Sequence, residues 1–164
     1  MKSITTAFFL LPLFLLPLKV SLAGASTENG WRGLVPLRSL RTDVERVLGP
    51  GTNECKCAYY LDDVNVFVVY ASGDCSSGET GGWNVSPNTV IRITVVPKPS
   101  PQLSDLNLNL NRFKKKQDPE IAENMYYIDE EQGFSLEVYL GTQQPLVRAF
   151  FYQPAAKYGH LRCP

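Results

Sequence analysis

The sequence contains nearly the same phrase twice, YYLDD at residues 59–63 and YYIDEE at residues 126–131. Each copy leads into an apolar stretch, VNVFVVY at 64–70 and GFSLEVY at 133–139. Tyrosine favours strands, and Asp and Glu favour the tight turn that follows a strand. Each copy therefore predicts a β-hairpin, and the recurrence indicates two similar units in one chain. Chance repetition of a common strand-and-turn phrase is the alternative.

A third strand-like run follows each predicted hairpin, VIRITVV at 90–96 and LVRAFFYQP at 146–154. The first of these runs alternates apolar and polar side chains, which is typical of a strand with one buried face. Arg92 and Arg148 fall at matching places in the two runs. The same order of elements therefore occurs twice, as a duplicated unit requires.

The proline-rich stretch PKPSP at 97–101 is expected to connect the two halves, because proline cannot donate a backbone hydrogen bond to a neighbouring strand. The half-repeats then cover about 34–97 and 102–154, followed by a C-terminal tail at 155–164. One such unit cannot bury its apolar face alone, whereas two side by side can form a larger sheet. We predict an α+β fold, in which two similar helix-plus-three-strand halves form one mostly antiparallel sheet with short helices on one face.

The stretch LRTDVERVLG at 40–49 carries the signals of a short helix. Thr42 is placed as its N-cap, and Glu45 follows three residues later, which is the spacing of a capping box. Gly49 is expected to end the helix. The apolar residues share one helical face: Val44, Val47 and Leu48. In the second half, the Leu/Asn alternation at 106–111 is compatible with either a helix or an extended chain.

The run TDVERVLGP at 42–50, followed by predicted antiparallel strands, resembles the helix-to-sheet entry of small envelope proteins of the SmpA/OmlA (BamE-like) group. A tandem pair of such units is similar to the β-lactamase-inhibitory-protein fold. The resemblance implies a protein-binding or envelope-assembly scaffold, without identifying a partner. The chain departs from the pattern in having no lipid-attachment cysteine at the signal junction, no V-x-x-x-L-G helix in its second half, and differently placed cysteines.

Residues 1–25 have the organisation of a cleavable signal peptide. Lys2 supplies a positive n-region, residues 7–18 form an apolar run, and small residues follow up to Ala25. That run is too short for a spanning helix, which needs about 20 apolar residues. We expect cleavage after Ala25 in preference to Ala23, and therefore a secreted or periplasmic protein with no stable membrane insertion.

Cleavage would leave one exported domain, residues 26–164, with 14 basic and 16 acidic side chains. A chain of this length can bury roughly two-thirds of its unfolded surface and needs only one core. The mild charge lacks the positive field that nucleic-acid binding requires. We therefore predict one compact domain and no nucleic-acid partner.

The even number of cysteines predicts two disulfides in an exported chain. Neighbours two apart on an extended strand are poorly placed to bridge, so Cys55–Cys57 is the least expected pair. We favour Cys55–Cys75 with Cys57–Cys163, and the remaining cross-pairing stays open. A zinc site built from these cysteines and His160 is the alternative, although zinc sites usually contain C-x-x-C pairs. No metal or other cofactor is predicted.

Few residues suggest catalysis. His160 is the only histidine, and it lies in the C-terminal tail. Paired carboxylates of the kind that glycosidases use occur at 62–63 and 129–131, but both groups fall at expected turns. The lysines at 114–116 form a dense charge run, either solvated or able to dock on an anionic surface. A small secreted hydrolase using turn carboxylates or His160 is the alternative function.

Aromatic and arginine side chains on one face of the predicted sheet favour a binding role. Strand alternation is expected to turn one set of residues toward the helices: Ile91, Ile93, Val95, Val147, Ala149 and Phe151. The opposite face would then carry Glu137 with Arg92, Thr94, Tyr139, Arg148, Phe150 and Tyr152. Such residue types are enriched at the centres of binding surfaces.

We therefore predict an exported, non-catalytic protein that binds a protein or cell-envelope component through an exposed sheet face. The predicted binding residues are Arg92, Tyr139, Arg148, Phe150 and Tyr152. Cross-strand aromatic packing, covered by the loop that contains Trp83, is the structural alternative for the same residues.

Overall fold

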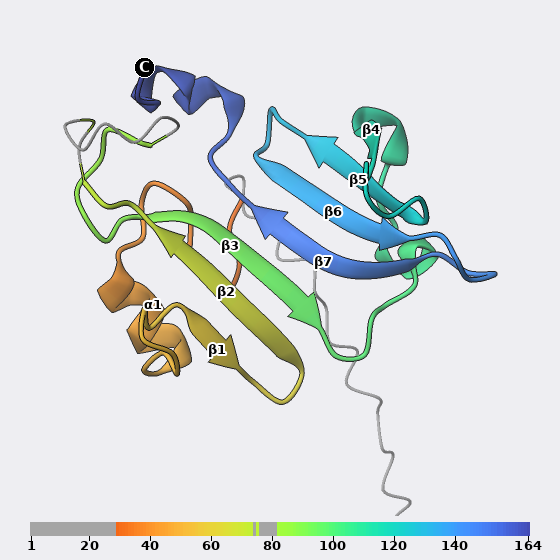
Figure 1. The fold of residues 1–164 in the computed structure, drawn as a ribbon, viewed down its shortest axis with the longest axis horizontal. Helices are drawn as coiled ribbons and strands as arrows, with labels where there is room; N and C mark the ends of the chain where they lie inside the picture. Colours follow the sequence, from red (N-terminus) through yellow and green to blue (C-terminus); the bar gives the residue numbers. More distant parts are fainter. Residues whose placement is uncertain (1–28, 74, 76–81) are drawn as a thin grey trace, which may run out of the picture.

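A computed structural model of the chain describes residues 29–73, 75 and 82–164, and shows one seven-stranded sheet (Figure 1). The order of the strands is β1-β2-β3-β7-β6-β5-β4, and every neighbouring pair is antiparallel. The α+β class with an antiparallel sheet is thereby confirmed. The strands are β1 Ala58–Tyr60, β2 Val64–Tyr70, β3 Val90–Pro97, β4 Lys114–Gln117, β5 Asn124–Asp129, β6 Phe134–Tyr139 and β7 Leu146–Tyr152. The predicted signal peptide, residues 1–25, lies outside the described residues.

The helix α1, Arg41–Leu48, begins two residues earlier than a cap at Thr42 would allow, and its N-cap is Leu40. Thr42 is therefore not the N-cap, because it already lies inside the first turn. The Asp43 carboxylate accepts a hydrogen bond from the Leu40 backbone N–H at 2.8 Å, so an acid in the first turn binds the N–H at the helix start. Val44 is fully buried and Leu48 packs against the core, whereas Val47 is exposed.

Short 3-10 turns take the place of a second α-helix. They are η2 Leu103–Leu106 and η3 Leu110–Arg112 between β3 and β4, and η4 Ala156–Leu161 after β7. Four leucines in η2, in η3 and between them pack against the apolar cluster of β5–β7: Leu103, Leu106, Leu108 and Leu110. Because every second residue is apolar over 106–110, the chain can place these leucines on the sheet without a regular helix.

Two apolar clusters form the core on one face of the sheet. The first includes Val44 of α1, Trp31 and Leu34 of the N-terminal segment, and the inward residues of β1–β3. The second joins Phe113 to the inward residues of β5–β7. Phe150 packs against both clusters, so the two cores are continuous across the centre of the sheet.

The two central strands, β3 and β7, each contain a bulge near their start. Where β2 pairs with β3, the register shifts and Ile91 has no register partner. Where β6 pairs with β7, the register shifts and Arg148 has none. A bulge rotates the following residues onto the other face. The bulges lie at Ile91 in β3 and at Arg148 in β7, whereas Arg92 pairs with Val69 in regular register.

The repeated tyrosine phrase also occupies different registers in its two copies. In β1, Tyr59 is buried and pairs with Val66, and Tyr60 is exposed. In β5, it is the second tyrosine, Tyr127, that is buried in the core. The phrases predict the two hairpins correctly, but their tyrosines are not structurally equivalent.

The lysine run at 114–116 forms β4, an edge strand that the sequence did not predict. All four of its residues are exposed, and the Lys114 ammonium is 2.7 Å from the Glu130 carboxylate. Lysines on an edge strand oppose the addition of another strand. The run therefore protects one edge of the sheet.

All four cysteines form disulfides, as predicted, but the favoured pairing is wrong. Cys55 bonds to Cys57, and Cys75 bonds to Cys163. The prediction assumed an extended strand at 55–57, whereas Lys56 has a left-handed φ of 49°. This turn brings the Cα atoms of Cys55 and Cys57 to 5.2 Å, within the ordinary range for a disulfide.

The C-terminal segment runs back from β7 and lies beside the loop between β2 and β3 (Figure 1). Besides the Cys75–Cys163 disulfide, Trp83 forms an isolated bridge with Arg162, and the Cys163 N–H donates to the Gly82 carbonyl at 2.9 Å. Covalent and backbone bonds thus fix the tail at one end of the sheet.

Candidate functional site

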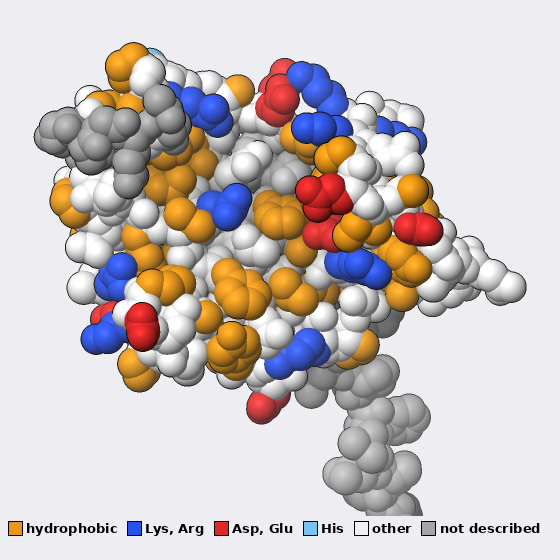
Figure 2. Space-filling model, in the orientation of Figure 1, with side chains coloured by type: hydrophobic (Ala, Val, Ile, Leu, Met, Phe, Trp, Pro, Cys, Tyr) orange, Lys and Arg blue, Asp and Glu red, His pale blue; other side chains and the backbone are white. Residues whose placement is uncertain are grey.

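The face of the sheet opposite the core is here called the open face. In the view of Figure 1, no helix crosses in front of β2, β3 or β7, and Figure 2 shows hydrophobic side chains there with single charged side chains between them. Among the described elements, α1, η2 and η3 pack their apolar residues on the opposite side. The open face includes Tyr60, Asn65, Phe67, Val69, Arg92, Thr94, Val96, Asn124, Tyr126, Ile128, Ser135, Glu137, Tyr139, Arg148, Ala149 and Phe151.

An apolar row crosses the open face on β1 and β2. Tyr60 is 62% exposed, Phe67 is 38% exposed and Val69 is 41% exposed. The rings of Tyr60 and Phe67 meet edge to face, with 6.2 Å between their centroids. Adjacent exposed apolar side chains of this size are a common sign of an interaction surface.

Two of the predicted binding residues lie together at the other end of the open face. The Arg148 guanidinium is 4.1 Å from the centroid of the Tyr139 ring, a cation–π contact. Glu137 lies on the same side, and its carboxylate accepts a hydrogen bond from the Asn124 amide at 2.8 Å. Burial raises the pKa of Glu137, and nearby Asp118 adds to this effect, whereas Arg148 lowers the pKa.

Tyr126 and Asp118 complete this polar group. The Tyr126 hydroxyl donates to the Asp118 carboxylate at 3.0 Å. Burial, with the Asp118 hydrogen bond and the charge of Glu137, raises the pKa of Tyr126 to about 12. Backbone N–H groups of Glu120 and Ile121 lower the pKa of Asp118. Asp118 therefore stays ionised beside a tyrosine that stays neutral.

Phe150 and Tyr152 do not lie on the open face, so this part of the predicted surface is wrong. Phe150 pairs with Val95, Tyr152 pairs with Ile93, and all four side chains face the core. The bulge at Arg148 is the reason, because it inverts the alternation over the rest of β7. Ala149 and Phe151, which were expected to face the helices, lie on the open face instead.

A cavity of about 240 Å³ opens at the end of the open face where the C-terminal segment meets β2 and β3. Its walls are Val69, Trp83, Ile91, Arg92, Gln153, Pro154 and Arg162. The Arg162 guanidinium is 5.1 Å from the centroid of the buried Trp83 ring. Two arginines and no carboxylate line this cavity among the residues that the structure describes, so it is cationic.

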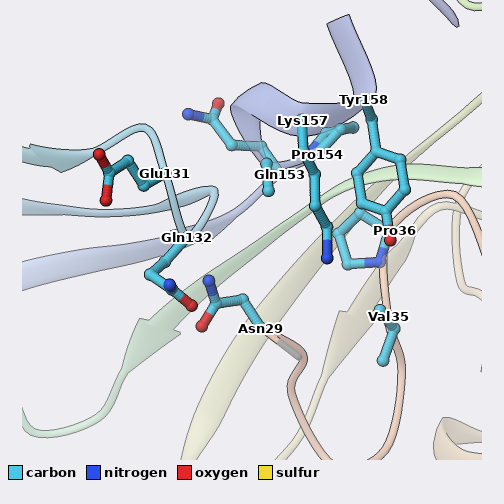
Figure 3. Close-up of a pocket in the computed structure, with 10 residues that line it drawn as sticks. Asn29, Val35, Pro36, Glu131, Gln132, Gln153, Pro154, Lys157 and Tyr158 are labelled. Atoms are coloured by element: carbon cyan, nitrogen blue, oxygen red, sulfur yellow. The ribbon is translucent and has the colours of Figure 1, made fainter. Parts of the chain in front are cut away.

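A smaller cavity of about 160 Å³ lies among the N-terminal segment, the β5–β6 turn and the C-terminal segment. Figure 3 shows Asn29 and Gln132 facing each other across it, with Lys157 and Tyr158 of η4 pointing toward Pro36. Glu131 and Lys157 both line it, so it carries both signs of charge. Its amide and charged groups distinguish it from the cationic cavity.

The turn carboxylates form ion pairs with nearby cations. Asp129 is buried, and its carboxylate bonds to the Arg112 guanidinium. Glu130 pairs with Lys114, and Asp63 pairs with Arg32 at 3.2 Å. These pairs supply a structural role for acids that were considered as a catalytic pair.

His160 is exposed in η4. Its ring Nδ1 lies 3.2 Å from the Lys157 carbonyl oxygen. Among residues 29–73, 75 and 82–164, no group of three or more His, Cys, Asp or Glu residues is arranged to hold a metal ion. Over the same residues, no helix is both long enough and apolar enough to cross a bilayer.

Comparison with protein-family models, curated proteins and solved structures gave no match to this chain. The site must therefore be judged on its own chemistry. It comprises the apolar row, the Arg148–Tyr139 pair and the cationic cavity.

Sequence reasoning missed all three residues of the apolar row and also Arg162 in the wall of the cationic cavity. The signal for the row was present in VNVFVVY, where Phe67 and Val69 alternate with the buried Val64, Val66 and Val68. Arg162 gave no such signal, because its place beside Trp83 depends on the folding back of the tail.

Proposed function

We propose that this protein is an exported, non-catalytic binding protein that takes a protein partner on the open face. The observation that carries the proposal is the exposed apolar row of Tyr60, Phe67 and Val69, which lies on the same face as Arg92 and Arg148. Aromatic and arginine side chains contribute most to binding energy at protein interfaces. A partner surface with apolar and acidic side chains would complement this face in shape and charge.

Export is part of the proposal. Two disulfides fit an oxidising compartment, and the N-terminal sequence has the order of a signal peptide with cleavage after Ala25. Mass spectrometry of the exported chain should then find Ser26 as its first residue. A chain that retains Met1 after export would contradict this part of the proposal.

The ion pairs of the turn acids support a non-catalytic role, because Asp129 and Glu130 each bind a cation instead of facing a second free carboxylate. The resemblance of residues 42–50 to the SmpA/OmlA (BamE-like) group points the same way, toward assembly or binding. Hydrolysis using Asp62, Asp63 or His160 predicts loss of activity on their substitution, and binding predicts none.

We test the proposal by photo-crosslinking. A benzophenone amino acid is placed at position 67 on the open face and, as a matched control, at position 47 on α1, where Val47 is also exposed. Each protein is irradiated with the exported fraction of the producing cells. We expect one discrete adduct from position 67 and none of that mass from position 47.

Competition with unlabelled protein tests whether the adduct depends on the open face. Unlabelled wild-type protein should suppress the adduct at position 67, and a variant carrying R92E and R148E should not. Equal suppression by both proteins, or the same adducts from positions 47 and 67, would overturn the proposal. Circular dichroism of the double variant checks that both exposed substitutions leave the fold intact.

We also infer that the two halves of the sheet descend from one duplicated unit. In support, β1-β2-β3 and β5-β6-β7 mirror each other in the strand order, and each third strand carries a bulge opposite its second strand. In an experimental structure, β2–β3 should superpose on β6–β7 with Ile91 over Arg148. Superposition only in a different register would remove the support.

A further inference from the structure

We propose that the cationic cavity, lined by Arg92 and Arg162, binds a carboxylate side chain of the protein partner that occupies the open face. This inference rests on the proposed function and adds to it the chemistry of one contact. The acidic side chain would enter the cavity while a neighbouring apolar side chain of the partner packs on Phe67.

Arg162 is held in place before any ligand arrives. Its backbone bridges Trp83, its guanidinium lies over the Trp83 ring, and the next residue, Cys163, is bonded to Cys75. A guanidinium with a fixed position loses little conformational freedom on binding an anion. Trp83 is buried beneath Arg162, so the ring is a support for the cation.

Arg92 is an exposed cation without a described counter-ion. Among residues 29–73, 75 and 82–164, no carboxylate forms an ion pair or hydrogen bond with its guanidinium. Arg148 on the same face differs, since its guanidinium lies over the Tyr139 ring and near Glu137. Two guanidinium groups around one cavity of about 240 Å³ favour a compact anion, and arginine binds carboxylates through paired hydrogen bonds.

Continuity with the apolar row identifies the carboxylate as part of a protein chain. Val69 lines the cavity and also belongs to the row, and Phe67 is two residues away along β2 on the same face. Side chains two apart on a strand are about 7 Å apart. An extended partner segment with an acid at one position and an apolar residue two positions later would match this spacing.

The test uses three synthetic peptides and NMR spectra of the full mature protein. The first peptide is acetyl-Thr-Glu-Thr-Leu-Thr-amide, the second replaces Glu with Gln, and the third places Glu and Leu next to each other. The signals followed are the Nε–H groups of Arg92 and Arg162 and the indole N–H of Trp83. We expect the first peptide to bind about tenfold more tightly than either control, because a charge-assisted hydrogen bond is worth about 1.5–3 kcal/mol.

Matched variants test whether Arg92 and Arg162 cause the preference for the Glu peptide over the Gln peptide. R92Q and R162Q should each reduce the preference for Glu over Gln to less than about twofold, and R46Q on α1 should leave it unchanged. Arg46 is a suitable control because its guanidinium is also exposed but lies on another surface. Equal binding of the Glu and Gln peptides to the wild type would overturn the proposal, as would loss of preference in R46Q alone.

Other classes of anion are titrated into the protein in separate experiments. Inorganic phosphate or glucuronate that shifts the Arg92 and Arg162 signals at lower concentration than the Glu peptide would reassign the cavity to that class of ligand. Asp74 and Glu79 lie outside the described residues, so a D74N/E79Q variant is included. A shift of the Arg92 signal in that variant without any peptide would show that the protein's own loop fills the cavity.

The two proposals fail in different ways. If the adduct at position 67 forms equally in wild type and R92Q, and the Glu peptide shows no preference, the open face binds its partner without the cavity. If the Glu peptide binds as expected and no adduct forms at position 67, the cavity binds carboxylates and the proposed partner surface is wrong.

Discussion

Phe150 of β7 lies directly opposite Val95 of β3, where the two halves of the sheet meet. Both side chains face the core, and Phe150 also stacks on Phe134 of β6 with 6.3 Å between ring centroids. It is a contact of both apolar clusters. A single ring thus connects the core of one half to the core of the other.

Replacing Phe150 with Ala should destabilise the whole domain. We expect a loss of about 2–4 kcal/mol in the free energy of unfolding, because the change leaves a cavity between two packed clusters. Urea denaturation followed by circular dichroism measures the loss. Phe67→Ala on the open face is the control and should cost less than about 1 kcal/mol, since Phe67 is partly exposed. Equal losses in the two variants would place Phe150 outside the core.

The sequence predicted six of the seven strands because their apolar residues alternate or cluster between turn residues. It did not predict β4, since Lys114–Gln117 has no apolar alternation and forms a strand only by pairing with β5. The bulge at Arg148 could not be predicted from the sequence either, because a register shift depends on the neighbouring strand. One unpredicted bulge was enough to place Phe150 and Tyr152 on the wrong face.

Only those parts of the candidate site that depend on alternation within a single strand could be predicted from the sequence. Arg92, Tyr139 and Arg148 were placed on the correct side of the sheet, and the alternation in β2 also contained the apolar row. The cationic cavity requires the tail to return to Trp83, a contact between residues far apart in the sequence. Such contacts depend on tertiary packing and leave no periodic pattern.

Gly133 is a position where a side chain would not fit. Its φ is +66°, and an added Cβ would lie 2.1 Å from the Gln153 carbonyl oxygen. Gly133→Ala should therefore lower the free energy of unfolding by about 2–4 kcal/mol, from the left-handed backbone and from steric overlap together. Thermal or urea unfolding gives the value.

Gly159→Ala is the matched control for this change. Apart from its chain neighbours and the backbone of its own turn, no described heavy atom lies within 4 Å of the position that its Cβ would take. The expected effect on stability is within about 0.5 kcal/mol, as for most surface substitutions. A Gly133→Ala protein as stable as the Gly159→Ala protein would show that the β5–β6 turn can move away from β7.

The two disulfides should differ greatly in their contribution to stability. Cys75 and Cys163 are 88 residues apart, and the chain-entropy relation assigns about 4–5 kcal/mol to a loop of that length. Cys55 and Cys57 are 2 residues apart, which gives about 1–2 kcal/mol. Double Cys→Ser variants, compared by urea denaturation, should lose stability in that order. The reverse order would mean that the tail is held chiefly by its non-covalent contacts.

The ionisation of Glu137, on the open face, is expected to make the stability of the domain depend on pH. The groups facing it are Tyr126 and Asn124 of β5, Arg148 of β7, and Asp118 before β5. Burial raises its pKa above the ordinary value of 4.5, so the folded protein holds this proton more tightly than the unfolded chain. Between those two pKa values, the folded state binds more protons, and stability therefore falls as the pH rises through that window.

Glu137→Gln should remove this pH-dependent loss. The variant keeps an oxygen that can accept the Asn124 hydrogen bond but cannot ionise. Its stability relative to the wild type should therefore be higher at about pH 7 than at about pH 4, as measured by urea denaturation at each pH. Arg148→Gln is the opposing control: Arg148 lowers the pKa of Glu137, so its removal should widen the pH window and increase the total loss of stability. If Glu137→Gln follows the wild-type pH profile, the carboxylate is solvated in the folded protein and contributes no pH dependence.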